Sequence, residues 1–134
     1  MEQVKIKLTN QRTGEVSYLG WKGSKKWLLR CVSEEEALVF SLKPYKDGAS
    51  YYIFYLEEYK HKKHGLRLDY HTGAGDVFGS QHESTANSWK IEDNKLVPRI
   101  HKGGLAMCPS DEDDDPNLYV SLRLEPFIVE QIPV

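Results

Sequence analysis

Residues 65–89 read GLRLDYHTGAGDVFGSQHESTANSW and contain the pattern from which the fold of the whole chain is predicted. Apolar and polar residues alternate up to Tyr70, which predicts a strand, and residues 76–78 are expected to form a second, shorter one. The HTGAG segment between them carries the glycines that a tight turn favours. A polar loop then leads to Trp89. The stretch therefore predicts a β-hairpin, a loop and a large aromatic residue that ends the unit.

Short strands separated by turn residues account for the rest of the chain. Gly, Pro, Asn and Asp mark the turns, among them residues 10–14 (NQRTG) and 92–95 (EDNK). Ser33 and Glu36 have the spacing of a capping box and predict a single helical turn. Together with the hairpin above, about twelve strands are expected, which predicts an all-β barrel or sandwich. The other strands are expected in residues 4–10, 16–21, 26–32, 38–42, 50–59, 89–91, 96–100, 105–108, 118–122 and 127–134.

Leucine and aromatic residues recur three times at a nearly constant spacing. In each case a leucine on an early strand precedes a closing aromatic residue by 21 or 22 positions. A repeat of this kind indicates similar units that bury a shared core together. The three pairs are Leu19 and Phe40, Leu68 and Trp89, and Leu105 and Phe127.

Three units of about four short strands are the arrangement of a β-trefoil, in which a barrel is capped by three hairpins. The spacing therefore predicts a single β-trefoil domain over residues 1–134, with pseudo-repeats at approximately 1–46, 47–95 and 96–134. An up-and-down barrel of the fatty-acid-binding type is the alternative. That fold normally has longer hairpin strands, and it leaves the three spacings unexplained.

The length and charge of the chain limit its classes of function. A chain of 134 residues fits one domain. Its net charge of −2 predicts no general attraction to nucleic acid. No apolar run approaches the length of a membrane span. The N-terminal residues lack the basic segment and apolar core of a secretion signal, so we expect a soluble protein that is cytoplasmic or secreted without a visible signal peptide.

Cysteines, histidines and carboxylates are the candidate metal ligands and catalytic groups of the chain. Cys31 and Cys108 are expected to be buried, reduced thiols, with a disulfide as the alternative. His61 and His64 lie in a lysine-rich turn whose charge opposes a cation, and the acidic run at residues 111–115 lacks the glycine and closing glutamate of an EF-hand. We expect no metal and no cofactor. Neither a nucleophile motif nor a phosphate-binding loop is present, so an enzyme is not expected.

Three short motifs follow one another in the middle unit: Leu68-Asp69, Val77-Phe78 and Asn87-Ser88-Trp89. They resemble the leucine–aspartate pair, the Val/Ile-x-apolar strand and the closing Gln-x-Trp of a repeat in the ricin B-type (R-type) lectins, which are β-trefoils. Asn87 replaces the usual glutamine, and the usual cysteines within the repeat are missing. The resemblance implies a trefoil fold for the whole chain and carbohydrate binding by the second repeat.

A saccharide site on such a repeat needs a carboxylate for adjacent hydroxyl groups, an aromatic ring for the apolar face of the sugar, and an amide. Asp69 is the candidate carboxylate and Asn87 the candidate amide, while His82 lies in the loop expected to close over the pocket. The alternative is structural, with Asp69 capping the HTGAG turn and Asn87 bonding the hairpin backbone. The full set of candidate carbohydrate-binding residues is Asp69, Tyr70, His71, Phe78, His82 and Asn87.

The first and third units lack this carboxylate, because Gly20 and Ala106 stand in place of Asp69. Trp21 and Trp27 are candidates for an exposed aromatic platform in the first unit or, alternatively, for packing at the core and its rim. The leading hypothesis is a non-enzymatic, lectin-like protein whose second repeat recognises a saccharide or the glycan of a glycoprotein.

Other single-domain trefoils define the alternative functions. Protease inhibitors use an exposed loop, here residues 44–50 or 110–117. Cytoskeletal trefoils of the hisactophilin and fascin kind suggest a protein-interaction module, which here would use the basic turn at residues 60–64. The sequence leaves these three hypotheses open.

Overall fold

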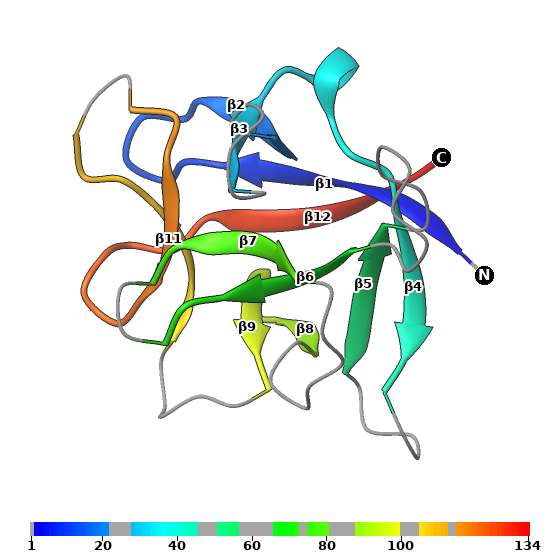
Figure 1. Cartoon of the computed structure of the whole chain (residues 1–134). Helices are drawn as coiled ribbons and strands as arrows, with labels where there is room; N and C mark the ends of the chain where they lie inside the picture. The colour runs from blue at the N-terminus through cyan, green and yellow to red at the C-terminus, as the bar shows by residue number, and fades with distance from the viewer. Residues whose placement is uncertain are drawn as a thin grey trace.

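The computed structural model describes residues 2–21, 28–45, 51–56, 66–72, 75–80, 88–99, 105–112 and 115–134. These residues form an all-β fold whose main sheet curls into a half-barrel (Figure 1). They contain twelve strands and one turn of 3-10 helix, η1 (Glu34–Glu36), which confirms the expected number of strands for this part of the chain. The strands are β1 (Gln3–Thr9), β2 (Val16–Trp21), β3 (Leu29–Val32), β4 (Phe40–Pro44), β5 (Tyr52–Leu56), β6 (Leu66–Tyr70), β7 (Val77–Ser80), β8 (Trp89–Glu92), β9 (Lys95–Pro98), β10 (Ala106–Pro109), β11 (Leu118–Ser121) and β12 (Ile128–Pro133).

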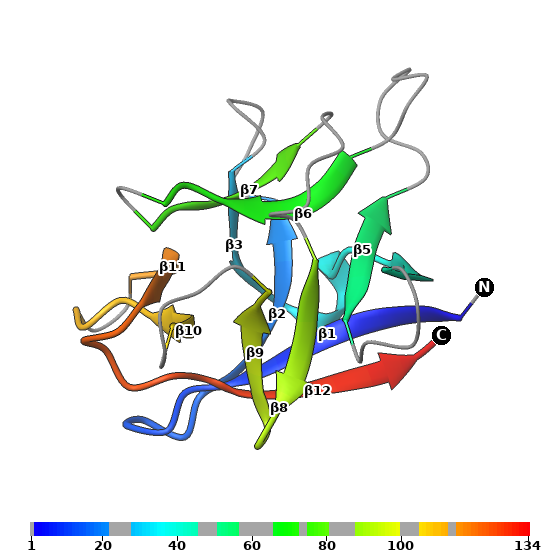
Figure 2. The ribbon, with the colours of Figure 1, turned by 90° about the horizontal axis from the view of Figure 1, so that it is seen from below.

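Strand β1 is central to the main sheet and pairs with three neighbours. It pairs with β12 from Val4–Pro133 to Thr9–Ile128, and also with β2 and β4. From β4 the sheet continues through β5 to β6 and β7, while β5 also pairs with β8, and β8 with β9. These pairs are antiparallel. Figure 2 shows β1 and β12 side by side, with the two ends of the chain close together.

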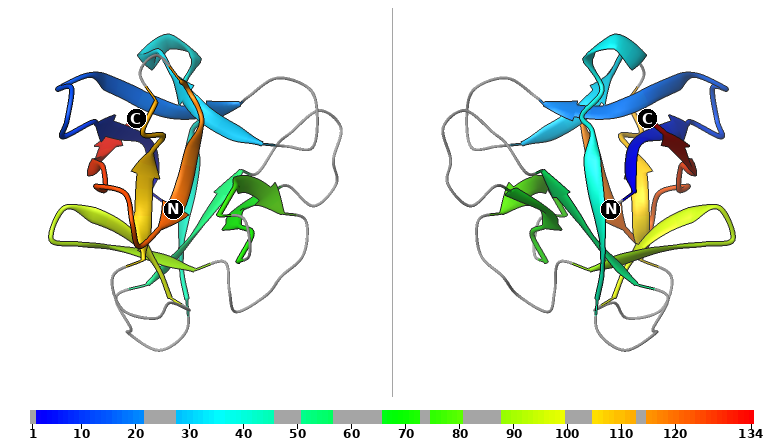
Figure 3. Two further views of the ribbon diagram at one scale, coloured as in Figure 1. Left: turned by 90° about the vertical axis from the view of Figure 1, so that its left-hand side faces the viewer. Right: turned by 90° about the vertical axis from the view of Figure 1, so that its right-hand side faces the viewer.

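Strands β10 and β11 form a separate hairpin. This hairpin meets β3 and β7 at a junction held by single bridges between strands. Figure 3 shows the assembled strands from two opposite sides, with η1 projecting at one end. The β2–β3, β6–β7 and β10–β11 hairpins thus all contribute a strand to one junction. The bridges are Leu28–Phe78, Arg30–Asn117 and Asp76–Tyr119.

One hydrophobic core lies under the curled sheet. Alternate residues of β1, β6 and β11 point into it, as in β6, where Leu68 and Tyr70 are buried and Asp69 is half-buried. The predicted closing aromatics are no more than 1% exposed and belong to the same cluster, so their shared burial is confirmed. Burying each of these rings contributes roughly 2–3 kcal/mol to folding. The three rings are those of Phe40, Trp89 and Phe127.

Hydrogen bonds link the early leucine to the closing segment in the first two units. The indole N–H of Trp89 donates to the carbonyl oxygen of Leu68 at 2.9 Å. The backbone N–H of Leu38, two residues before Phe40, donates to the carbonyl oxygen of Leu19 at 3.1 Å. The leucine and the closing segment, distant in sequence, are therefore neighbours in space.

Two tight turns have the predicted geometry. The side-chain oxygen of Asn10 accepts two backbone N–H groups of its own turn, and Gly14 has a φ of 74°. Asp93 and Asn94 connect β8 and β9 with φ values of 52° and 63°. Positive φ at both central residues is what a two-residue type I′ hairpin requires. The turns expected at residues 10–14 and 92–95 are confirmed.

The single helical turn is present, but its cap differs from the prediction. A capping box needs the Ser33 side chain to accept the backbone N–H of Glu36. In η1 that N–H instead donates to the backbone carbonyl of Ser33 at 3.1 Å, because the turn is a 3-10 helix. The Ser33 hydroxyl donates to the Glu36 carboxylate at 3.3 Å. The predicted capping box is therefore wrong, although the turn itself is confirmed.

Several predictions concern residues outside the described ranges. They include Trp27 at the expected start of the third strand, the histidines of the basic turn at residues 60–64, and the end of the strand expected at 50–59. Trp21 is described, and its half-buried side chain packs against the core. For this tryptophan, core-rim packing is confirmed over an exposed platform.

The hairpin junction generates a test of the fold. Gly75 has a φ of 82°, and a Cβ added there would lie 2.7 Å from the carbonyl oxygen of Val120. We predict that Gly75→Ala lowers the free energy of unfolding by about 2–4 kcal/mol, because left-handed strain adds to a clash between two backbones. The matched control is Gly14→Ala, where φ is 74° and nothing lies within 4 Å of the added Cβ. Strain alone should cost about 1–2 kcal/mol there. Urea unfolding of both variants measures the difference, and equal losses would contradict the close packing of β11 on Gly75.

Candidate functional site

The β6–β7 hairpin carries four of the six candidate site residues. Asp69 on β6 and Phe78 on β7 are direct cross-strand partners, so their side chains point to the same side of the hairpin. His71 follows Asp69 by two positions and continues that outer row. The alternation of β6 thus separates an outer row from the inner row that enters the core.

Two aromatic rings lie in parallel on the outer side of this hairpin. The imidazole of His71 stacks on Phe78 with ring centroids 4.4 Å apart and an interplanar angle of 20°. His71 is exposed and Phe78 is half-buried, so the imidazole forms the outer layer of the stack. The flat face of the His71 imidazole is therefore presented to solvent, close to Asp69, which is the cross-strand partner of Phe78.

Asp69 also has a local structural role. Its Oδ1 accepts the backbone N–H of Tyr70 at 2.8 Å. This bond supports the structural interpretation of Asp69 in part, although it lies in β6 and not in the HTGAG turn. That turn is closed by backbone bonds, in which Gly75 N–H donates to the His71 carbonyl at 2.7 Å and His71 N–H donates to the Asp76 carbonyl at 2.9 Å. An ionised carboxylate has about four lone-pair positions, so one backbone bond is compatible with a ligand role.

The ring of Tyr70 belongs to the core. Its side chain is only 7% exposed and meets Trp89 edge-on, with centroids 5.6 Å apart and planes at 63°. Burial raises the pKa of the Tyr70 phenol, and the nearby Asp69 carboxylate raises it further. A ring covered in this way has no free face for a sugar. Within the described residues, the aromatic part of the proposed site is therefore the His71–Phe78 pair. The predicted contributions of His82 and Asn87 lie outside the described ranges.

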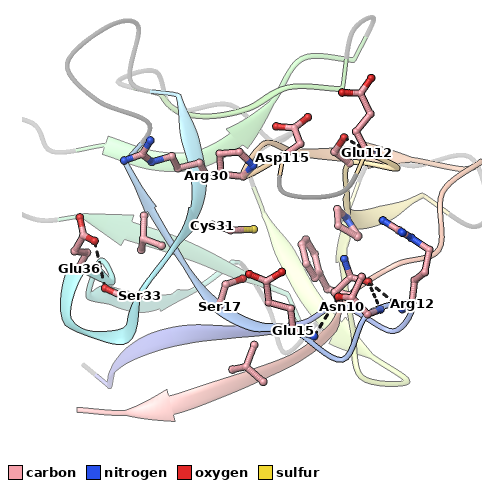
Figure 4. A pocket seen from close by; sticks show the side chains of 17 residues that line it. Asn10, Arg12, Glu15, Ser17, Arg30, Cys31, Ser33, Glu36, Glu112 and Asp115 are labelled. Carbon is pink, nitrogen blue, oxygen red and sulfur yellow. Dashed lines mark hydrogen bonds between the residues drawn. The ribbon is translucent and has the colours of Figure 1, made fainter.

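The structure also forms a pocket that the sequence did not indicate (Figure 4). The pocket has a volume of about 490 Å³, within the range of small-molecule sites. It lies between the β1–β2 turn, β3 and η1 on one side and residues 109–112 and 115–116 on the other. These segments are far apart in the chain, so no local motif marks them. Only the packing of the β10–β11 hairpin against β3 brings them together.

Cys31 lies at the centre of this pocket. Burial raises the pKa of its thiol, a hydrogen bond with Ser17 opposes that shift, and the carboxylates of Glu15 and Asp115 add to it. The charged side chains around the thiol are four carboxylates, from Glu15, Glu36, Glu112 and Asp115, and two guanidinium groups, from Arg12 and Arg30. The pocket is therefore formally anionic.

Arg30 is the polar residue of the pocket with an unmet hydrogen bond. Its Nε atom is buried and has no acceptor in the part of the chain that the structure describes. A buried donor without an acceptor costs about 1–3 kcal/mol. Figure 4 shows the guanidinium at the rim, directed away from the centre where Cys31 lies. The positive charge of Arg30 is thus displaced from the middle of the pocket.

Both cysteines are free thiols. Cys108 is fully buried, as expected, whereas Cys31 is only half-buried because it faces the pocket. Among the described residues, no group of three or more His, Cys, Asp or Glu side chains is placed to hold a metal ion. No helix found in those residues is long and apolar enough to cross a membrane.

The chain matches no protein-family profile, no curated protein and no solved structure. The candidate site therefore rests on the chemistry and geometry of its own residues.

The buried thiol of Cys108 makes stability depend on pH. Burial raises the pKa of this thiol to about 11, whereas a thiol in an unfolded chain titrates near pH 8.5. Between these values the unfolded chain has lost the proton and the folded protein retains it, so raising the pH favours unfolding. The contribution of the protonated Cys108 thiol to the free energy of unfolding is complete below about pH 8.5. Up to about 3 kcal/mol of this free energy is lost by pH 11.

We predict that Cys108→Ala reduces the fall in the free energy of unfolding with rising pH, whatever its effect on stability at neutral pH. Urea unfolding of both proteins at intervals across the alkaline range measures the two slopes. Cys31, Tyr70 and Tyr119 also have raised pKa values and are present in both proteins, so the difference between the two slopes reports on Cys108. Identical slopes would contradict a raised pKa for Cys108.

Proposed function

We propose that the described half-barrel is part of a β-trefoil. Hydrogen-bonded pairs connect β12, β1, β4, β5, β8 and β9 in succession, and a bond from Val129 N–H to the Asn94 carbonyl at 2.7 Å joins β12 back to the β8–β9 turn. Six strands in a ring, with three hairpins meeting at one junction, are what the trefoil interpretation of the leucine–aromatic spacing requires.

The trefoil proposal predicts that β9 and β12 lie side by side in solution. Nuclear Overhauser contacts between backbone protons of residues 95–98 and those of residues 128–130 would support the closed ring. Contacts between β1 and β12 are the internal control, because their pairing is extensive in the half-barrel as well. A spectrum that shows the control contacts without those between β9 and β12 would contradict a trefoil.

We further propose that the protein is a non-enzymatic carbohydrate-binding protein that recognises a saccharide through the second repeat. The observation that carries this proposal is the His71–Phe78 stack, whose exposed imidazole lies on the outer side of the hairpin that bears Asp69. A sugar ring has an apolar face of C–H groups that packs on such a flat aromatic surface. Its adjacent hydroxyl groups donate to a carboxylate such as Asp69.

Each residue of this site has a distinct role in the proposed binding. His71 provides the stacking surface, and its ring nitrogens add hydrogen-bonding capacity for a hydroxyl. Phe78 supports the imidazole from below and fixes its plane. Asp69 accepts hydrogen bonds from the sugar and is held in place by its own bond to the Tyr70 N–H. The inner row anchors the hairpin, since Tyr70 packs on Trp89.

A glycan array followed by calorimetric titration with the best monosaccharide tests this function. We predict that Asp69→Asn weakens binding by about tenfold or more, the loss of a charge-assisted hydrogen bond. Asparagine keeps an oxygen acceptor for the Tyr70 N–H, so this variant is expected to fold. His71→Ala should weaken binding by about three- to tenfold, because it removes one stacking ring from an exposed position.

Asp111→Asn is the matched control, since Asp111 is an exposed aspartate outside the β6–β7 hairpin. It should bind like the unchanged protein. An array without any binder at millimolar sugar would contradict the proposed function. If Asp69→Asn left the saccharide affinity as unchanged as Asp111→Asn does, that result would also contradict the proposed function.

A further inference from the structure

The pocket around Cys31 is separate from the proposed saccharide site. It is formed by residues of the first and third units, whereas the proposed saccharide site lies on the β6–β7 hairpin of the second. Its volume of about 490 Å³ suits a ligand the size of one or two sugar rings.

Two carboxylates of this pocket are available for a ligand. The side chains of Glu15 and Glu112 make no hydrogen bond or ion pair with any part of the chain that the structure describes. Both residues are exposed, so each carboxylate is solvated at the mouth of the pocket. With four carboxylates against two guanidinium groups, the pocket favours a cationic over an anionic ligand.

The centre of the pocket lies between carboxylates from two sides. Figure 4 shows the Cys31 sulfur between Glu15, on the first-unit side, and Asp115, on the third-unit side. The same two carboxylates raise the pKa of the Cys31 thiol, which places both within electrostatic range of one point. The protonated thiol contributes no charge of its own there. A positive group at this point therefore meets two negative charges, whereas Arg30 points away from it.

The remaining surface of the pocket combines apolar and hydroxyl groups. Val16 and Val32 offer apolar surface, while Ser17 and Ser110 place hydroxyl groups nearby. A ligand with hydroxyl groups around a compact carbon skeleton complements such a lining better than a purely apolar amine does.

We propose that this pocket binds a small hydroxylated organic cation, such as a sugar or amino alcohol with a free amine, whose ammonium group lies between Glu15 and Asp115. The ammonium group donates to the two carboxylates, and the hydroxyl groups bond the polar rim. Neutral analogues of the same shape lack the charge that the pocket selects.

Titration with glucosamine at about pH 6, where an amine of this kind is protonated, tests the proposal. N-acetylglucosamine and glucose are the matched neutral probes. Backbone amide NMR shifts locate the binding, and calorimetry measures its affinity. We predict that glucosamine shifts the amides of Glu15, Cys31 and Asp115 and binds at least about tenfold more tightly than either neutral sugar.

Glu15→Gln should weaken glucosamine binding by about tenfold, and the double variant with Asp115→Asn should weaken it further. Asparagine at position 115 keeps the oxygen that accepts the Asn117 N–H at 3.0 Å. Glu130→Gln is the control, because Glu130 pairs with Lys7 on β1, outside the pocket. It should leave glucosamine binding unchanged.

The outcome separates this site from the proposed saccharide site. Amide shifts confined to Asp69, His71 and Phe78, or binding lost on Asp69→Asn but not on Glu15→Gln, would overturn the pocket proposal while supporting the other. Equal binding of glucosamine and N-acetylglucosamine would overturn it as well, and so would the absence of glucosamine binding at millimolar concentration. Glucosamine binding that fails with Glu15→Gln and persists with Asp69→Asn would support the pocket, whatever the glycan array shows.

Discussion

The shared burial of Phe40, Trp89 and Phe127 is the constraint on which the rest of the structure depends. Each ring ends a different stretch of chain, and all three lie in one cluster with apolar residues of the other strands. The strands therefore curl around one cluster instead of forming an open, flat sheet. The indole N–H of Trp89 fixes this arrangement further, because it donates to the Leu68 carbonyl on β6. Through that bond the core holds the hairpin that carries the candidate saccharide site.

The orientation of the candidate site follows from this attachment. Because Leu68 and Tyr70 enter the core, the alternation of β6 directs Asp69 and His71 to the outer side. Phe78 faces the same side as the partner of Asp69 across the hairpin. A shift of one residue in this pairing would bury the carboxylate and expose the leucine. The core thus sets the register, and the register places the side chains of the candidate site.

The pocket around Cys31 has a different origin. Its two walls come from the first and third units, and they meet because the β10–β11 hairpin packs against β3 at the same junction where Gly75 approaches Val120. Glu15 and Asp115, a hundred residues apart in the sequence, thereby act on one thiol. The two proposed sites share one framework but use different units of it, so substitutions in one are expected to leave the other unchanged.

The all-β class and the glycine and asparagine turns could be predicted from the sequence, because strand alternation and turn chemistry act over a few residues. The leucine–aromatic spacing could also be found in the sequence. The sequence also identified Asp69, His71 and Phe78 as residues of one hairpin. The sequence pattern offered Tyr70 equally as a sugar-stacking ring, whereas contacts between distant strands pack this ring on Trp89. The anionic pocket was decided by tertiary structure alone. Local periodicity specifies which way a side chain points, but contacts between distant segments decide what it then meets.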